Sequence, residues 1–285
     1  MDEHLVDSGG CRGLALVGDT MRTISWVASA ALLLVATAQG ATQQPPPQAD
    51  AAATLIAEFR AGEWTRRRAA FEQLLKEPQI LTLAQKKEIL TEIVERQNAE
   101  RDAAFREGGG VSQKYGESYG EYAAELGGYL FSLIDAQDVA ALAAIAQTAY
   151  HANGPYAQRL AAYGEALVPA ILKLADSDIS PNRWQAFGLA GGIHRLSRQR
   201  ATKSPLSDAA LAQLKAVLLA GTRDEDIANR QIAVRNLGVA GLAEFLPLLE
   251  SIVQTDPAVS TLRGAAEYPV RDEARKAIVR IRSGQ

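Results

Sequence analysis

The sequence predicts an all-α fold, organised as a right-handed α-solenoid of helical hairpins. First, the pattern Arg-x-x-Ala opens an apolar helical stretch at three places, starting at Arg183, Arg230 and Arg271, which are 47 and 41 residues apart. Second, apolar residues recur at helical spacing along most of the chain. Third, only 6% of the 285 residues are aromatic and alanine is plentiful, which suits close-packed helices better than a β-sandwich. One such hairpin cannot bury its own apolar face, so neighbouring hairpins must stack on it.

Each residue type in the repeated pattern has a physical role in such a stack. An acidic residue precedes each helix and can cap its free backbone N–H groups: Asp178, Asp226 and Glu267. The arginine can bridge to the acid of the adjacent repeat, which would make a ladder between stacked units, although contact with a ligand is the alternative role. The fourth position holds Ala186, Ala233 and Ala274, whose small side chains let a paired helix approach closely.

The period in the forties, with two helices in each unit, is typical of the HEAT and armadillo class of repeats. The first helix of two units carries a proline near its start, Pro169 and Pro247. On these residues the chain resembles the HEAT-repeat (armadillo-type) family, most clearly over residues 156–281. The resemblance implies an α-solenoid and protein–protein binding, and it implies no catalytic residue. Two polar insertions, 199–207 and 256–267, depart from the family pattern.

The earlier part of the chain is helical but only loosely repetitive. Helices are expected over 51–60 and 63–76, and Arg67 with Ala70 faintly repeats the Arg-x-x-Ala pattern. Thr82 and Gln85 form a capping box that opens a helix reaching about Glu107. The Gly108–Gly110 run divides an N-terminal helical segment, 51–110, from the repeat region, 111–283. Further helices are expected over 112–134 and 139–150, the latter capped by Asp135 or Asp138.

The N-terminus has the layout of an export signal. Residues 1–20 are acidic and look like an extension upstream of the true start, so translation is expected to begin at Met21. Residues 21–38 have a short positive end, an apolar run and small residues before a cut after Ala38, as in a secretory signal peptide. A transmembrane anchor is the alternative, but the apolar run is shorter than the roughly 20 residues a span needs. Residues 39–50 read as a Gln/Pro-rich linker. The mature protein is therefore expected to be periplasmic or secreted, with no membrane span.

Composition narrows the chemistry. The net charge of −3 is too close to neutral for a polyanion binder, so nucleic acid is not an expected partner. The one cysteine, Cys11, lies upstream of the predicted cut. The mature chain would then have no thiol for a disulfide, a cysteine-ligated zinc site or a nucleophile, and no metal or other cofactor is expected.

Catalytic patterns are sparse. After the signal peptide only His151 and His194 remain, 43 residues apart and without a carboxylate at metal-ligand spacing. His194 lies late in a repeat helix, where a surface or capping role is expected because a cation is favoured there. A row of glutamates, Glu117, Glu121 and Glu125, indicates a solvated helix face rather than an acid/base pair.

Two groups of residues are candidates for partner binding. A tyrosine stripe runs along the 112–134 helix, interleaved with glycines: Tyr115, Tyr119, Tyr122 and Tyr129. Tyrosine is enriched in binding patches, but the rings could equally cover a neighbouring helix. The second group is basic and lies on the second helices of the repeats: His194, Arg195, Arg235 and Lys276 are its candidate contacts. Helix-end charges that offset the helix dipole are the alternative explanation.

These observations favour an exported, non-catalytic scaffold that binds another protein, possibly an acidic one, along its solenoid face. Two other readings stay open. HEAT-like proteins include some lyases, so an enzyme or enzyme subunit is an alternative, although scarce histidine and absent cysteine weigh against it. A small-molecule or glycan binder using the tyrosine stripe between Tyr115 and Tyr129 is the third.

Overall fold

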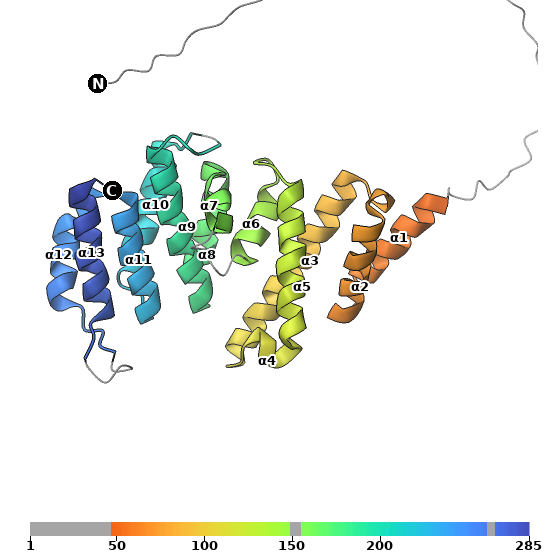
Figure 1. Ribbon diagram of the computed structural model, residues 1–285, viewed down its shortest axis with the longest axis horizontal. Helices are drawn as coiled ribbons and strands as arrows, with labels where there is room; N and C mark the ends of the chain where they lie inside the picture. The colour runs from red at the N-terminus through yellow and green to blue at the C-terminus, as the bar shows by residue number, and fades with distance from the viewer. Residues whose placement is uncertain (1–46, 149–154, 204, 261–265, 285) are drawn as a thin grey trace, which may run out of the picture. The chain divides into compact units, whose positions relative to one another are not determined.

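The computed structural model describes residues 47–148, 155–203, 205–260 and 266–284 (Figure 1). All of them belong to one compact unit, Pro45–Gln285. Within these residues the fold is all-helical and contains no β-strand, so the predicted fold class is confirmed at that level. The export signal, the upstream extension, Cys11 and His151 lie outside the described residues.

The described residues form thirteen α-helices and three short 3-10 helices. In chain order the α-helices are α1 (Pro47–Phe59), α2 (Trp64–Lys76), α3 (Leu83–Arg106), α4 (Val111–Tyr115), α5 (Glu117–Leu133), α6 (Val139–Thr148), α7 (Pro155–Ala161), α8 (Val168–Ala175), α9 (Ser180–Arg198), α10 (Asp208–Gly221), α11 (Ile227–Ala240), α12 (Leu246–Thr255) and α13 (Pro269–Ser283). The 3-10 turns are Pro78–Ile80, Gly164–Leu167 and Ala243–Phe245. Helix α1 includes the last four residues of the expected linker, because proline is tolerated in a helical first turn.

The capping box at the start of α3 is confirmed. The Gln85 N–H donates to Thr82 Oγ1 at 3.3 Å, and the Thr82 N–H donates to Gln85 Oε1 at 2.9 Å. These reciprocal bonds satisfy two backbone donors that the first turn would otherwise leave free. The helix they open runs for 24 residues and ends at Arg106, close to the expected end.

The single helix expected over 112–134 is wrong, because the chain breaks at Gly116. This residue has φ +85°, in the left-handed region that glycine adopts without strain, and it separates α4 from α5. The glycines in this stretch therefore include one with a specific backbone role. The next helix, α6, is described from Val139 to Thr148. The Asp138 carboxylate accepts from the Lys87 ammonium and the Asp135 N–H.

In the C-terminal part, α11 packs between α9 and α13, while α8 and α10 pack on α9, and α12 packs on α13 (Figure 1). Small residues set the closest approaches. A Cβ on Gly238 would lie 2.7 Å from the Ala277 Cα, and a Cβ on Gly221 would lie 2.7 Å from the Ala233 Cβ. Larger side chains would force these helices apart, since interiors are close-packed.

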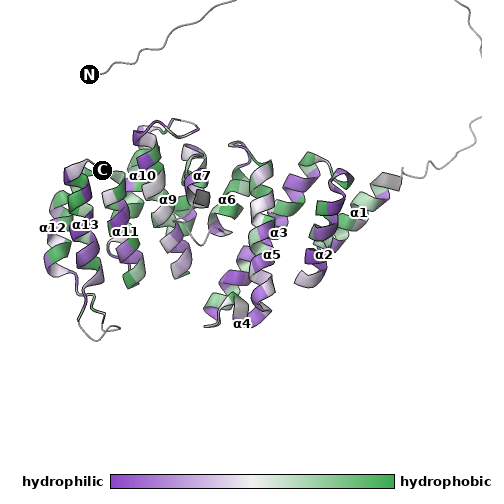
Figure 2. Ribbon diagram, in the orientation of Figure 1, coloured by the Kyte–Doolittle hydropathy of each residue, from purple (hydrophilic) through white to green (hydrophobic). Residues whose placement is uncertain are grey.

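Every labelled helix in Figure 2 carries both hydrophilic and hydrophobic residues. Consistent with that mixture, no helix in the described ranges is long and apolar enough to cross a membrane. The apolar faces meet in one continuous core that extends from Leu55 in α1 to Ile278 in α13.

Candidate functional site

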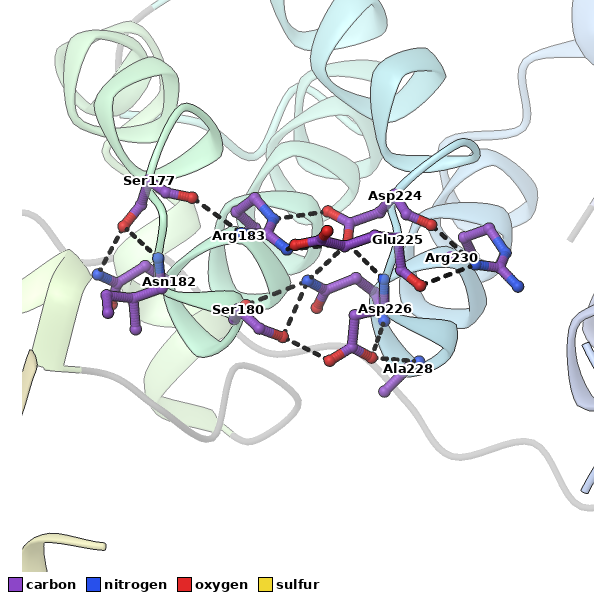
Figure 3. A network of polar contacts seen from close by, with 11 residues as sticks. Ser177, Ser180, Asn182, Arg183, Asp224, Glu225, Asp226, Ala228 and Arg230 are labelled. Carbon is purple, nitrogen blue, oxygen red and sulfur yellow. Dashed lines mark hydrogen bonds and ion pairs between the residues drawn. The ribbon is translucent and has the colours of Figure 1, made fainter. Parts of the chain in front are cut away.

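Two arginines of the repeated pattern link successive helical units. Arg183 of α9 donates from Nε and Nη2 to the Asp224 carboxylate, at 2.7 and 3.1 Å, in the loop that leads into α11 (Figure 3). Arg230 of α11 reaches the Asp256 carboxylate at 3.1 Å, in the segment that follows α12. Both pairs are largely buried, with 13% of each arginine side chain exposed. We call these two links the arginine ladder.

The same arginines also fix the loop that precedes their own helix. Arg183 Nη1 donates to the carbonyl of Ser177 at 3.0 Å, and Arg230 Nη1 donates to the carbonyl of Asp224 at 2.8 Å. Both acceptors lie six residues before the arginine. Arg271 makes the corresponding bond from Nε to the Asp256 carbonyl at 2.7 Å, across the insertion that lengthens the last unit. The guanidinium group therefore fixes the loop of its own unit and, in α9 and α11, the loop of the next one.

The faint copy of the pattern at Arg67 has the same local geometry. Arg67 Nη1 donates to the carbonyls of Ala61 and Gly62, six and five residues before it, at 3.4 and 2.9 Å. Its Nη2 bonds the Glu100 carboxylate on α3 at 2.7 Å. Arg67 is fully buried. The repeated contact thus extends to α2, where the sequence pattern was weakest.

The ladder's acids differ from those expected. Asp226 caps α11, accepting from the Ala228 N–H at 2.7 Å, as predicted. Asp178 makes no cap bond to α9 and instead binds Arg106 of α3 at 2.9 Å. The N-cap residue of α13 is Tyr268, one position after the expected Glu267. The carboxylates that pair with the ladder arginines are Asp224 and Asp256. Each also accepts a hydrogen bond from the backbone N–H two residues later, that of Asp226 and of Ala258 respectively. Such turns orient a short acidic side chain in a loop.

Burial and hydrogen bonding act in opposite directions on the ladder acid Asp224. Burial raises the pKa of this carboxyl group, but hydrogen bonds from Arg183, from the Asp226 N–H and from Asn229 lower it by more. The net pKa lies below the ordinary value, so the group is a stable anion at neutral pH. An acid held in this way suits a structural pair rather than proton transfer.

Two buried asparagines complete the network and were not singled out from the sequence. Asn182 and Asn229 each stand directly before a ladder arginine. The Asn229 amide donates to Ser180 Oγ and to Asp224, while Asn182 donates to Ser177 Oγ and to the buried Asp102 of α3. The Asn-Arg-x-x-Ala pattern occurs twice at the same offset, and this was the signal available in the sequence.

The small fourth residues of the pattern are all interior. Ala186, Ala233 and Ala274 have no exposed surface. A further close approach lies between α9 and α11, where a Cβ on Gly191 would lie 2.3 Å from Asn236 Oδ1. The small side chains therefore set the helix spacing along α9, α11 and α13.

The basic candidates separate into two places. Arg235 and Lys276 are brought together by Glu273, a buried carboxylate that sequence reasoning missed: Arg235 Nε donates to it at 3.1 Å and Lys276 Nζ lies 3.6 Å away. Arg280 Nη1 also lies 3.6 Å from Glu273. Burial raises the pKa of Glu273, but Arg235 above all, and also Lys276 and Arg280, lower it by more. The net pKa lies below the ordinary value.

His194 and Arg195 do not join this group. Arg235 and Lys276 each stand five positions after the arginine of their repeat, whereas Arg195 stands twelve positions after Arg183, about two helical turns farther along. His194 is buried rather than on the surface, because α10 packs over α9, and its Nε2 lies 3.3 Å from the Leu211 carbonyl. Burial lowers the pKa of this imidazole. Arg195 is half-buried on the same turn.

The tyrosine stripe packs mostly inward. Tyr119 and Tyr122 are buried, and the Tyr119 hydroxyl donates to Glu100 at 2.6 Å. The Tyr115 ring stacks on the Tyr119 ring with centroids 4.8 Å apart. Lys114 Nζ lies 5.6 Å from the centroid of the Tyr115 ring. Trp64 meets Tyr119 edge to face at 5.6 Å. Burial is the main cause that raises the pKa of both buried phenols. Most ring surface in the stripe is therefore used inside the protein.

Two of the grooves on the described surface border residues of the polar network and of the tyrosine stripe. The larger has a volume of about 590 Å³ and lies among α3, α6, α8 and α9, with the carboxylate of Asp102 and the amides of Gln147 and Asn182 in its lining. Gln147 and Asn182 both donate to the Asp102 carboxylate, at 2.8 and 3.1 Å. The smaller groove, of about 460 Å³, lies along α3 and α5 and is mainly apolar.

No set of three His, Cys, Asp or Glu side chains within the described ranges is placed to hold a metal ion. The carboxyl groups with a shifted pKa, Glu58, Asp138, Asp178, Asp224 and Glu273, all have a lysine or arginine partner. A comparison of the chain with models of known protein families gives no match, and neither does a comparison with curated proteins. The HEAT-repeat resemblance therefore stays a prediction drawn from the chain's own residues.

Proposed function

We propose that the chain is an exported, non-catalytic repeat protein that binds an acidic region of another protein. In this proposal α8 with α9, α10 with α11, and α12 with α13 are HEAT-like hairpins of a right-handed α-solenoid. The recurring arginine-to-loop contact supports it. Arg67, Arg183 and Arg230 each donate from Nη1 to a carbonyl five or six residues earlier, and Arg271 donates from Nε to a loop carbonyl before its own helix. Repeated contacts of this kind are expected where each unit rests on its neighbour.

The observation that carries the binding function is the cation cluster, which we define as Arg235, Lys276 and Arg280 around Glu273. Three cations face one carboxylate, so the cluster has an excess of positive charge. The neighbouring Val279 is 64% exposed, the largest value among the large hydrophobic side chains of the described residues. Basic and apolar groups side by side match an acidic segment that contains an apolar residue.

Two further cations on α13 are neutralised locally. Arg275 pairs with Asp272 within the helix, and Arg282 pairs with Glu250 on α12 at 2.6 Å. The unbalanced charge therefore lies toward α11, where Arg235 is. Within about 8 Å, the screening length at physiological salt, the three cations of the cluster act together on one ligand.

The test uses a photo-crosslinking residue at position 279, with position 83 as the control because Leu83 is also exposed, at 55%. Crosslinking in the secreted or envelope fraction of the producing organism should capture a partner from position 279 only, and less of it at high salt. Lys276→Gln combined with Arg280→Gln should weaken capture several-fold, since charge steers association. Arg275→Gln combined with Arg282→Gln removes the same charge from the same helix and should not.

Reversing the charge of Arg235 with Arg235→Glu is unsuitable for this experiment. It would set a second carboxylate beside the buried Glu273 and destabilise the fold. Equal capture by both double variants, or equal capture from positions 279 and 83, would contradict the proposed binding face.

A further inference from the structure

The smaller groove has the composition of a small-molecule site. Its walls are formed by apolar and small side chains: Phe105, Val111, Ala123 and Ala124, with Gly120 between them. Its volume of about 460 Å³ falls in the range of ligand pockets, which combine apolar walls with a few polar groups. It is remote in sequence from the cation cluster, and it is independent of the proposed protein-binding function.

Most polar groups along this groove are already bonded within the protein. The Asn98 amide donates to the Ala144 carbonyl, and its oxygen accepts from Thr148 Oγ1. The Tyr119 hydroxyl donates to Glu100. Arg101 is engaged by the Asp102 carboxylate, the Asn182 amide oxygen and the Gln147 carbonyl. The Arg101 charge is thus balanced by Asp102, and the groove does not select an anion.

Gln97 is the exception. Only 3% of its surface is exposed, and neither its amide nitrogen nor its amide oxygen has a hydrogen-bond partner among the described residues. A buried amide without partners is costly, and native proteins rarely keep one unless something else satisfies it. Its amide atoms are covered, but Gln97 lines the groove, so a rotation of this side chain would present both amide atoms to a ligand there.

Gly120 keeps the groove open on the α5 side. A Cβ at this position would meet nothing within 4 Å, so no steric reason excludes alanine there. Glycine inside a helix costs about 1 kcal/mol relative to alanine. The space that it leaves is available to a ligand.

We propose that this groove binds a compact, uncharged molecule with an apolar ring and one amide-type edge, such as a lactam. A primary amide presents one donor side and one acceptor side by side, and a lactam N–H and C=O are complementary to both. The ring then lies against Phe105, Val111 and the two alanines, and the lactam edge pairs with Gln97.

The probe is carbostyril, a bicyclic aromatic lactam, compared with N-methylcarbostyril, which lacks the donor. Binding to the purified protein is measured by ligand-observed NMR titration. Wild type should prefer carbostyril by about tenfold or more, because the methylated ring leaves the Gln97 oxygen unpaired. Gln97→Leu should fold at least as stably and lose this preference.

Gly120→Leu should fill the groove and abolish binding of both probes. Gly128→Leu is the matched control, since Gly128 lies on the same helix, is exposed and also has nothing within 4 Å of a Cβ. Both variants should gain helix stability, and only the control should still bind. The proposal is overturned by absence of carbostyril binding to wild type at millimolar concentration, by unchanged binding in Gly120→Leu, or by an unchanged preference in Gln97→Leu.

Discussion

The unit around α2 and the units around α9 and α11 use one arginine geometry with different partners. In α9 and α11 the arginine reaches a carboxylate held in the next loop, Asp224 or Asp256. In α2 the equivalent Arg67 reaches Glu100, in the middle of a helix. The arginine's bond to its own loop is therefore the constant element in these three units. The acid that completes the link varies, and the sequence pattern fades where the acid moves onto a helix.

The largest effect is expected where two helices of the C-terminal units touch. Ala233→Asp should prevent stable folding of that part, because Ala233 is fully buried and meets Gly221 of α10. A buried, unpaired carboxylate costs several kcal/mol, about the stability of a whole domain. Circular dichroism melting measures it. Ala228→Asp, at an exposed position of the same helix, should melt like wild type. Similar melting of the two variants would show that the contact at Ala233 is not a close one.

A second comparison tests how burial changes the value of an arginine–aspartate pair. Arg183→Met should lower the free energy of unfolding by about 3 kcal/mol or more, since it leaves Asp224 buried and unpaired. Arg106→Met removes an Arg–Asp pair of similar geometry in which both side chains are more than half exposed, 54% and 66%. That change should cost less than about 1 kcal/mol. Denaturant unfolding of both variants gives the difference, and equal losses would mean that the ladder is no more than a surface ion pair.

The contact between α9 and α11 gives an intermediate effect. Gly191→Ala should destabilise by about 1–3 kcal/mol, because its Cβ would lie 2.3 Å from Asn236 Oδ1 and force the helices apart. Asn236→Gly combined with Gly191→Ala should recover part of the loss, since it removes the Oδ1, Cβ and Cγ atoms of Asn236 that would lie within 2.6 Å of the new Cβ. A double-mutant cycle measures the coupling between the two positions. Additive losses would place the strain elsewhere.

The helical class, most helix positions and the capping box could be predicted from the sequence, because periodicity and caps are local signals. The break at Gly116 could not be placed among four neighbouring glycines, since the residue type does not state which one takes a positive φ. The acid that pairs with Arg183 was expected to be Asp226 and is Asp224, two residues earlier. The sequence could not separate the two, because the turn that orients a carboxylate depends on loop geometry. Glu273 and Gln97 were missed because their burial depends on neighbours distant in sequence.

The smallest effect is expected at His194. The pH dependence of stability there distinguishes a buried histidine from a surface one. Burial lowers the pKa of its imidazole by more than the hydrogen bond to the Leu211 carbonyl raises it. The positive charges of Lys215 and Arg198 add to the lowering, while Glu244 acts in the opposite direction. The folded state then binds fewer protons than the unfolded state, whose histidine has a pKa of about 6.5. The contribution to stability is fully present above that pH and is lost as pH falls from about 6.5 through the lower folded pKa.

Unfolding free energies of wild type and His194→Gln should therefore diverge between pH 7.5 and pH 5, with wild type losing more as the pH falls. The carboxyl groups with lowered pKa values, Asp224 and Glu273, titrate at lower pH and are present in both proteins. They cancel in the difference, as do the remaining histidines. Each unit of pKa difference corresponds to about 1.4 kcal/mol, so the divergence should be of that order or smaller. Parallel pH profiles would mean that the imidazole titrates as an exposed group and that α10 does not cover it in solution.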